Sequence, residues 1–378
     1  MKIAVIGGGI SGLSIAYNLA LRNAGEIHVY EKKWITYGSS TRSGARFRVH
    51  FWREENSKFA IESIKRLEKL STKMEWNPVI YRGGYLWLIT KENIVEQFRD
   101  ANKMWSRLGV PGIFLDQREV KERYPYIMVD DILSAFYGPQ NGSYHHDYVC
   151  FGYYSLAKSL GVHFHEMTTV DELIVSENKV KYVKTDKGEV DVDIVVLATG
   201  AWTNTLLEKL RISLPTEPLR REVCLTEPYH YFIEPLIIDT ESSAYFGQTL
   251  KGEILGSVDY PTPRGLIDLD VRFKVISAWA RAISKRVPLL KNSRIMRTWA
   301  GYYMMSLDES HIMGRDPEWP EGLYVAFGYS GHGFMMAPLV GELLAENIIT
   351  GRVDELMKPF LPTRFKENKL IKEKMVIG

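Results

Sequence analysis

The sequence predicts an α/β fold into which a second, β-rich part is inserted. Residues 2–6 are apolar and are followed at once by the stretch Gly7-Gly8-Gly9-Ile10-Ser11-Gly12 and by a helical pattern over residues 13–21. Similar nucleotide-fold signals recur near residues 200 and 330, and alternating strand patterns lie between them. Two domains whose segments alternate along the chain explain this order better than two consecutive domains.

The glycine-rich stretch predicts a dinucleotide site between the first strand and the first helix. Gly7 permits a tight turn, Gly9 lets the backbone approach a pyrophosphate, and Gly12 lets the helix pack closely on the strand. The start of the helix, at Ile10 and Ser11, offers unpaired N–H groups and a positive dipole end to phosphates. The alternative for this stretch alone is a glycine turn without a ligand.

A second strand over residues 27–30 completes a β-α-β unit and ends at Glu31. The carboxylate of Glu31 is expected to accept hydrogen bonds from the hydroxyls of an adenosine ribose. The same carboxylate would repel a 2′-phosphate, which argues against NADP. This pattern alone does not distinguish NAD from FAD.

The remaining elements are read from hydrophobic periodicity. Helical spacing of apolar residues is expected over residues 54–74, 92–108, 269–284 and 339–349. Strand patterns are expected over residues 85–89, 179–185, 190–197, 220–258 and 323–327, and the last of these leads into a glycine-rich loop over residues 328–333.

Composition and charge exclude several classes of protein. The chain has 378 residues, of which 45% are hydrophobic, so it can bury a large core. The 48 lysines and arginines nearly balance the 46 aspartates and glutamates, so nucleic acid is not an expected partner. Cys150 and Cys224 lie outside any C-x-x-C pair, which predicts neither a disulfide framework nor a cysteine zinc site.

We also expect a cytoplasmic protein without a metal site. The sequence shows no secretory signal pattern and no apolar run long enough to cross a bilayer. The segments His145-His146-Asp147 and His163-x-His165 could supply metal ligands, but no third convergent ligand is identifiable.

Two further segments resemble a known family. The first is Asp193-Ile194-Val195-Val196-Leu197-Ala198-Thr199-Gly200-Ala201-Trp202, which resembles a stretch of the FAD-dependent amino-acid oxidoreductases, the superfamily of D-amino-acid oxidase, glycine oxidase and sarcosine oxidase. The second comprises Arg297-Thr298-Trp299-Ala300-Gly301-Tyr302-Tyr303, Asp308-Glu309 and Gly328-Tyr329-Ser330-Gly331-His332-Gly333-Phe334-Met335-Met336-Ala337-Pro338. It resembles the catalytic β subunits of archaeal dye-linked L-proline dehydrogenases and the sarcosine oxidase β-type proteins. The similarity covers nearly the whole chain and is weaker over residues 90–295.

The resemblance implies a Rossmann-like FAD-binding domain of the glutathione reductase type, interleaved with a β-rich substrate domain. The FAD-binding domain would comprise residues 1–80, 140–215 and 295–378, and the substrate-binding domain residues 81–139 and 216–294. The segment 297–303 has no cysteine, so the FAD is expected to be non-covalent. The expected FAD contacts are Gly7, Gly9, Ile10, Ser11, Gly12, Glu31, Lys32, Ser39, Ser40, Arg42, Ser43, Gly44, Val170, Ala198, Thr199, Gly200, Trp202, Gly301, Gly331, His332, Gly333, Phe334 and Met335.

The loop Gly331-His332-Gly333 has a physical role in this interpretation. Its glycines let backbone amides approach the flavin pyrimidine ring, and the following helix directs its N-terminus to O2. Because a reduced flavin carries negative charge near N1 and O2, donors preorganised there favour the reduced state. Read without the family, the stretch is only a glycine loop before a helix.

Arg48 falls where the resemblance places the arginine that pairs with the substrate carboxylate. A planar guanidinium suits a carboxylate because two parallel N–H bonds fix its orientation as well as its charge. The candidate catalytic residues are Arg48, His332, Tyr245, Tyr260 and Tyr302.

The implied reaction is oxidation of the C–N bond of a small (secondary) amino acid such as L-proline or sarcosine to an imine, by hydride transfer to flavin N5. Met335 stands where the oxidase pattern has a lysine, and the lysine that assists oxygen activation in those oxidases is replaced near Ile254. Together with the absent cysteine, these departures favour a dehydrogenase with a partner subunit or another electron acceptor. The alternatives are an oxygen-using oxidase of glycine, sarcosine or a D-amino acid, a non-catalytic FAD-carrying subunit of a heteromer, and an NAD-dependent dehydrogenase.

Overall fold

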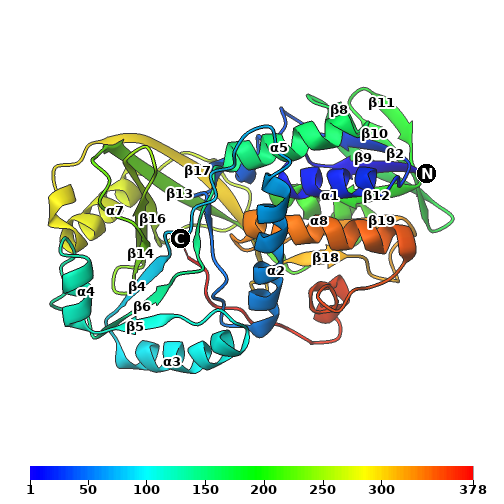
Figure 1. Ribbon diagram of the computed structural model, residues 1–378. Helices are drawn as coiled ribbons and strands as arrows, with labels where there is room; N and C mark the ends of the chain where they lie inside the picture. Colours follow the sequence, from blue (N-terminus) through cyan, green and yellow to red (C-terminus); the bar gives the residue numbers. More distant parts are fainter. Residues whose placement is uncertain (378) are drawn as a thin grey trace.

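The computed structural model describes residues 1–377 and contains two large sheets with a cavity between them. In Figure 1 the six-stranded sheet and its helices lie on the right, and the eight-stranded sheet lies on the left. Strands from the start, middle and end of the chain meet in the six-stranded sheet, which confirms the predicted Rossmann-like fold with a β-rich addition.

The six-stranded sheet holds the first strand at its centre. Its order is β18 (Ile312–Gly314), β19 (Leu323–Phe327), β12 (Ile194–Leu197), β1 (Lys2–Ile6), β2 (Glu26–Tyr30) and β8 (His163–His165). Only β18 is antiparallel to its neighbour within this sheet. Because side chains alternate along a strand, β1 buries Ile3 and Val5 on one face and Ala4 and Ile6 on the other.

Helices cover one face of this sheet and a strand meander covers the other. The helical layer consists of α1 (Ile10–Leu21), α2 (Glu54–Ser71), α5 (His146–Ser159) and α8 (Gly333–Thr350). The meander consists of β9 (Val170–Ser176), β10 (Lys179–Thr185) and β11 (Gly188–Asp191). Helices α1 and α8 run side by side in Figure 1, and Gly341 permits their close approach, since a Cβ there would lie 2.2 Å from Ser14 Oγ.

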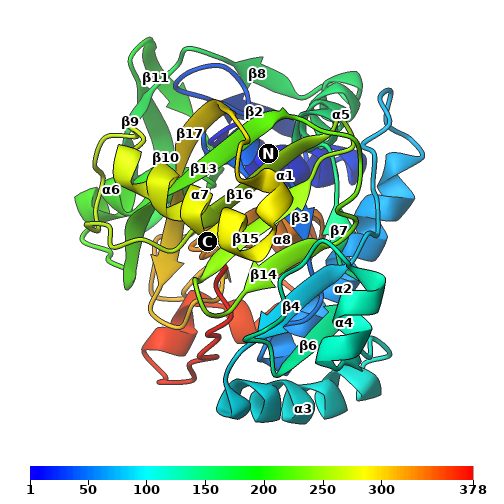
Figure 2. The same ribbon diagram turned by 90° about the vertical axis from the view of Figure 1, so that its left-hand side faces the viewer.

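The eight-stranded sheet forms the other wall of the cavity. Its order is β17 (Ile295–Ser306), β13 (Thr216–Pro228), β16 (Glu253–Val258), β15 (Ala244–Gln248), β14 (Leu236–Asp239), β4 (Tyr85–Ile89), β6 (Ser134–Gly138) and β5 (Ile113–Leu115). Helix α7 (Phe273–Arg286) covers its outer face, and Figure 2 shows it lying across β13, β15 and β16. Trp279 of α7 is buried there and donates its indole N–H to the Tyr245 carbonyl at 3.1 Å.

Further elements lie in the connections between the strands of these sheets. They are the helices α3 (Glu92–Arg107), α4 (Gln117–Arg123) and α6 (Thr203–Leu207), and the two-stranded sheet of β3 (Arg46–Phe47) and β7 (Gly142–Ser143). The N-terminus of α4 has a capping box, in which the Asp116 side chain accepts from the Glu119 N–H at 2.8 Å.

Several element boundaries differ from the expectations. The helix expected over residues 339–349 begins at Gly333, and Pro338 lies inside it. The strand expected over residues 190–197 is two strands, since the chain leaves the meander after β11 and enters the six-stranded sheet at β12. Residues 295–306, expected with the FAD-binding segments, pair along β13 in the eight-stranded sheet. The rest of the proposed domain division stays a prediction.

The segment after α8 returns to the region between the two sheets, and the C label of Figure 1 lies there. A buried ion pair fixes this segment: Arg364 donates to the Asp308 carboxylate from Nε at 2.8 Å and from Nη2 at 3.0 Å. Farther along, buried Glu373 accepts from the backbone N–H groups of Trp52 and Arg53 at 3.1 and 3.0 Å. These contacts carry residues 371–377 to the edge of the cavity.

Candidate active site

A cavity of about 640 Å³ lies between the two sheets, within the range of small-molecule and cofactor sites. It gathers residues from the two ends and the middle of the chain. The expected site residues that line it are Gly7, Gly9, Ile10, Ser11, Glu31, Lys32, Ser39, Ser40, Arg42, Ser43, Gly44, Arg48, Val170, Ala198, Thr199, Gly200, Trp202, Tyr245, Gly301, Tyr302, Gly331, His332, Gly333, Phe334 and Met335.

The start of α1 forms one end of the cavity. Gly9 is the residue before the helix and has no side chain to cap it, so the first N–H groups of α1 face the cavity without an intrahelical partner. Gly7 has φ +105°, and a Cβ there would lie 2.5 Å from the Ala198 carbonyl oxygen. Gly12 does not line the cavity: a Cβ at this position would lie 1.9 Å from the Gly7 carbonyl oxygen, so its glycine permits the close packing of helix and strand.

Glu31 lies at the end of β2 and is held by the glycine turn. Its carboxylate accepts from the backbone N–H of Gly8 at 2.9 Å and from that of Lys33 at 3.0 Å. Val170 and its neighbours at the start of β9 line the same end of the cavity. A carboxylate fixed beside helix N–H donors is the arrangement that binds an adenosine ribose and a pyrophosphate.

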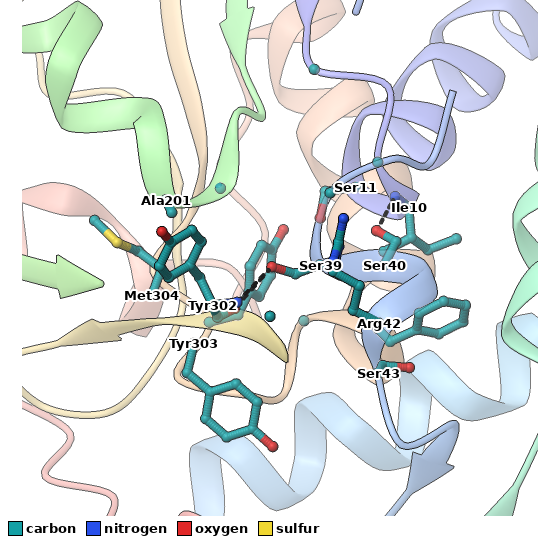
Figure 3. A pocket seen from close by; sticks show the side chains of 18 of the residues that line it. Ile10, Ser11, Ser39, Ser40, Arg42, Ser43, Ala201, Tyr302, Tyr303 and Met304 are labelled. Carbon is teal, nitrogen blue, oxygen red and sulfur yellow. Dashed lines mark hydrogen bonds between the residues drawn. The ribbon is translucent and has the colours of Figure 1, made fainter. Parts of the chain in front are cut away.

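The 3-10 helix η1 (Ser39–Arg42) lies between α1 and β17, as Figure 3 shows. Ser40 Oγ accepts from the Ile10 N–H at 2.9 Å, and Ser39 Oγ donates to the Tyr302 carbonyl at 2.9 Å. Arg42 donates to the Ala300 carbonyl at 3.2 Å. These bonds join the dinucleotide end of the cavity to the eight-stranded sheet.

The C-terminal loop before α8 forms another wall. Gly331 has φ +88°, and a Cβ there would lie 2.4 Å from the Tyr303 ring, so only glycine fits. The N-terminus of α8 follows directly, and its first residues, Gly333 to Met335, line the cavity. The buried Tyr329 hydroxyl also faces this region and has no partner among the residues described.

Arg48 and His332 are hydrogen-bonded within this wall. Arg48 Nη2 donates to His332 Nε2 at 2.9 Å and to the Met375 carbonyl, and the guanidinium lies 4.5 Å from the centre of the Phe51 ring. Burial, and then the charge of Arg48, hold the pKa of His332 well below its usual range. His332 is therefore neutral, and because Nε2 accepts from Arg48, its proton lies on Nδ1.

The eight-stranded sheet contributes tyrosines to the cavity. Tyr245 and Tyr85 point into it, and burial raises the pKa of both hydroxyls, so both stay protonated at neutral pH. Tyr302 and Tyr303 extend from β17 in opposite directions in Figure 3. The Tyr302 hydroxyl donates to the Ile267 carbonyl, and the Tyr303 hydroxyl donates to the Ile377 carbonyl at 3.2 Å.

Tyr260 was wrongly expected in the site. It is half-buried in the chain between β16 and α7, outside the residues that line the cavity, and Arg272 lies 5.3 Å from its ring centre. Strand β16 ends at Val258, so Ser257 is the last residue of this strand that faces the cavity.

Sequence reasoning missed several residues at the substrate end. Arg46, Arg221, Tyr85, Tyr144 and Tyr303 all line the cavity. One of them carried a detectable signal: Arg46 is two positions before Arg48, and side chains at this spacing along an extended segment share a face. The other four residues lie on separate segments of the chain, and no local pattern in the sequence shows that these segments meet at one cavity.

The other candidate ligands lie apart from this chemistry. Cys150 and Cys224 are buried in hydrophobic cores, outside the cavity lining that the structure describes. Among residues 1–377, no group of three or more histidine, cysteine, aspartate and glutamate side chains is placed to hold a metal ion. No helix in this part of the chain has the length and apolar character needed to cross a membrane.

The cavity fits a dinucleotide that carries a second ring system. One end supplies helix N–H groups and the Glu31 carboxylate, and the other supplies glycine backbone, the start of α8 and unpartnered polar atoms such as Arg48 Nε. At Gly331 a side chain is excluded by the Tyr303 ring, which lies 2.4 Å from where a Cβ would be.

Comparisons with known proteins agree with this fit. The model of the family described as FAD dependent oxidoreductase matches residues 2–347. The sarcosine oxidase subunit beta of Arthrobacter sp. is 29% identical over 98% of this chain and 92% of its own. The crystal structure of L-proline dehydrogenase from P. horikoshii has a TM-score of 0.91 and 33% identity over 98% of both chains. Glycine oxidase from Bacillus cereus ATCC 14579 shares the fold, with a TM-score of 0.83 and 24% identity over 94% of this chain and 97% of its own.

FAD is the cofactor that this family uses, and both ends of the cavity suit it. The NAD-dependent alternative is thereby set aside. From its glycine turn to its last long helix, the chain belongs to the family of FAD-dependent oxidoreductases.

Proposed function

We propose that the protein oxidises the C–N bond of a small secondary amino acid to an imine, as a dehydrogenase. The observation that carries the proposal is the hydrogen bond of 2.9 Å between Arg48 and His332, which joins a buried guanidinium to the glycine loop at the start of α8. A group that binds a carboxylate and a loop that suits a flavin thus share one wall of the cavity.

The residues at the substrate end have separate tasks in this proposal. Arg48 binds the substrate carboxylate and so fixes the direction of the amino acid. His332 is neutral and its Nε2 accepts from Arg48, so it orients the guanidinium and does not take the substrate proton. Protonated tyrosines and apolar side chains keep the cavity poor in water, which disfavours a charged substrate amine.

FAD, held between the start of α1 and the loop before α8, would supply the hydride acceptor for this oxidation. The substrate carbon loses its hydride as the nitrogen lone pair forms the C=N bond. The substrate thereby loses two electrons, and its nitrogen releases a proton to give the imine. The two electrons then pass to an acceptor, which we propose is a partner subunit in the cell and a redox dye in an assay. We propose non-covalent FAD, in keeping with the two cysteines being buried away from the cavity.

The names of two relatives support the substrate class. Sarcosine and L-proline are both secondary amines with an α-carboxylate, and proteins named for them match nearly the whole length of this chain. L-Proline is the first candidate, because the P. horikoshii structure shares 33% of its residues with this chain. The word subunit in the Arthrobacter name supports a partner chain that takes part in the reaction.

A substrate and acceptor series tests the proposal. The FAD-loaded protein is assayed with L-proline, sarcosine, hydroxyproline, glycine and D-amino acids, each with dichlorophenolindophenol under nitrogen and with oxygen. We expect L-proline or sarcosine to reduce the dye, with hydrogen peroxide formed far more slowly. Turnover of no amino acid would refute the proposal, and rapid peroxide formation would make the protein an oxidase.

Arg48→Met tests the anchor and the alternative of a non-catalytic FAD carrier. An enzyme should keep its yellow colour but lose substrate-dependent bleaching, because the carboxylate has lost its guanidinium. The exposed Arg297→Met, on β17, is the matched control and should bleach like the wild type. A wild type that no amino acid bleaches would favour the carrier.

A further inference from the structure

A second guanidinium, that of Arg46 in β3, reaches the same cavity as Arg48, which follows directly after this strand. Residues 46 and 48 are two positions apart, and side chains at this spacing leave a strand on the same side, about 7 Å apart. Phe47, between them, points the other way and is buried against Tyr144. The segment Arg46-Phe47-Arg48 therefore places two cations in the lining of one cavity.

Arg46 lies deep in the protein but keeps accessible surface, and that surface faces the cavity. Burial lowers the pKa of its guanidinium, and the groups that act against this are four tyrosines: Tyr85, Tyr245, Tyr231 and Tyr144. Its side chain donates to the Gln248 carbonyl at 3.2 Å. Gly247 leaves room for it, since a Cβ there would lie 2.9 Å from Arg46 Nη2.

Among the described residues, neither cation is paired with an anion. Within residues 1–377, no carboxylate forms an ion pair with Arg46 or Arg48, whereas Arg221, the third arginine at this end, pairs with Asp259 at 2.5 Å. A buried charge without a counter-charge is unfavourable. A bound anion removes this penalty at both arginines together.

Arg48 by itself offers fewer donors to that anion than a free guanidinium, because two of its five N–H groups are bonded to the protein. Both hydrogens of its Nη2 are used, one by His332 Nε2 and one by the Met375 carbonyl. Its Nε is buried without a partner. Arg46 has one hydrogen bond to the protein and accessible surface in the cavity, so it is the freer of the two donors.

We propose that Arg46 is a second substrate-binding residue, whose guanidinium binds the substrate carboxylate together with Arg48. This inference rests on the proposed function, because it concerns the acid group of the same substrate. Two guanidiniums around one carboxylate restrict the site to substrates with a fully charged acid group. An amine that lacks the carboxylate leaves both cations unpaired and is rejected.

Binding of a matched pair of non-oxidisable probes tests this without relying on turnover. Pyrrole-2-carboxylate and the neutral pyrrole-2-carboxamide are titrated into the FAD-loaded protein by calorimetry and by the change in the flavin spectrum. The measured quantity is the ratio of their dissociation constants. We expect Arg46→Gln to reduce the preference for the acid by about 30-fold or more, with binding of the amide changed by less than about 3-fold.

Two further variants complete the design. The exposed Arg297→Gln of β17 removes a positive charge outside the cavity and should keep the wild-type ratio. Arg46→Lys keeps the charge but not the two parallel N–H groups, so the ratio should fall by about 3- to 10-fold. It also tests the proposal should Arg46→Gln fail to fold, as judged by circular dichroism.

An acid-to-amide ratio that stays at the wild-type value in the folded Arg46 variants overturns the inference. Equal weakening of both probes overturns it too, since that marks a structural role. These results leave the proposed function intact, provided the wild type oxidises an amino acid. If the wild type neither oxidises an amino acid nor prefers the acid probe, the proposed function itself has failed.

Discussion

Replacing Asp308 by asparagine should destabilise the protein by about 3–5 kcal/mol, because it leaves a buried guanidinium without its counter-charge. Asp308 and Arg364 are both buried, and two hydrogen bonds of 2.8 and 3.0 Å join them. The same carboxylate accepts from the Ile371 N–H at 3.1 Å. The pair therefore holds both the segment after β17 and the C-terminal segment that reaches Arg48.

The expected change in melting temperature follows from the size of the chain. An unfolding entropy of about 2.1 cal/mol/K per residue gives about 0.8 kcal/mol/K for the 378 residues, if unfolding is cooperative. A loss of about 3–5 kcal/mol then lowers the melting temperature by about 4–6 °C. Asparagine has nearly the same shape as aspartate, so this effect comes from the charge and not from a cavity.

Thermal unfolding of the FAD-loaded protein, followed by tryptophan fluorescence and by circular dichroism, measures this effect. Asp308→Asn combined with Arg364→Met removes both charges, and it should recover part of the loss. The exposed pair of Glu355 and Lys358 supplies the control, since Glu355→Gln should shift the free energy of unfolding by less than about 0.5 kcal/mol. The reasoning is refuted if Asp308→Asn is as mild as that control, or if the double variant loses the sum of both single effects.

The remaining predictions concern pH, the glycine turn and the thiols. Burial raises the pKa of Asp308, but the hydrogen bonds and charge of Arg364 outweigh this and hold the pKa below its usual value. The ion pair therefore stabilises the protein fully at neutral pH, and this stabilisation is lost as pH falls through the lowered pKa. The difference in unfolding free energy between wild type and Asp308→Asn should accordingly be smaller in acid than at pH 7. Gly12→Ala places a Cβ where it meets the Gly7 carbonyl oxygen, so the purified variant should contain less FAD, as measured by the ratio of absorbance at 450 and 280 nm. Gly109→Ala is the control: Gly109 has φ +77° and no atom near the position of a Cβ, and this variant should contain as much FAD as the wild type. Burial raises the pKa of both thiols, that of Cys224 to about 12, so a thiol reagent at pH 8 should label fewer than one cysteine in the native chain and two after denaturation.

The positions of Arg48 and Tyr303 in the cavity depend on the C-terminal segment, residues 371–377. Arg48 is held by the Met375 carbonyl, and Tyr303 by the Ile377 carbonyl. Residues 371–377 in turn depend on Asp308 and Glu373. Substitutions outside the cavity lining, such as Asp308→Asn, should therefore also raise the KM for the amino acid.

The dinucleotide end of the site could be predicted because its parts are neighbours in the chain. Strand β1, the glycine turn, α1 and Glu31 lie within the first 31 residues, and their chemistry follows from local rules about turns, helix ends and packing. The loop before α8 was recognised through its resemblance to the family, because its glycines alone mark only a loop before a helix. The structure shows that Gly331 has a positive φ. Sequence also specified two buried faces for β1 and hence a sheet covered on both sides.

Only the tertiary structure decided the substrate end. Arg221, Tyr85 and Tyr303 come from three strands, and which of their side chains face the cavity depends on the register and pairing of the eight-stranded sheet. Tyr260 was excluded because β16 ends before it, a boundary that composition does not mark. The physical reason is that alternation along a strand determines which residues share a face. Whether that face turns toward the cavity or toward α7 depends on how segments distant in the sequence pack together.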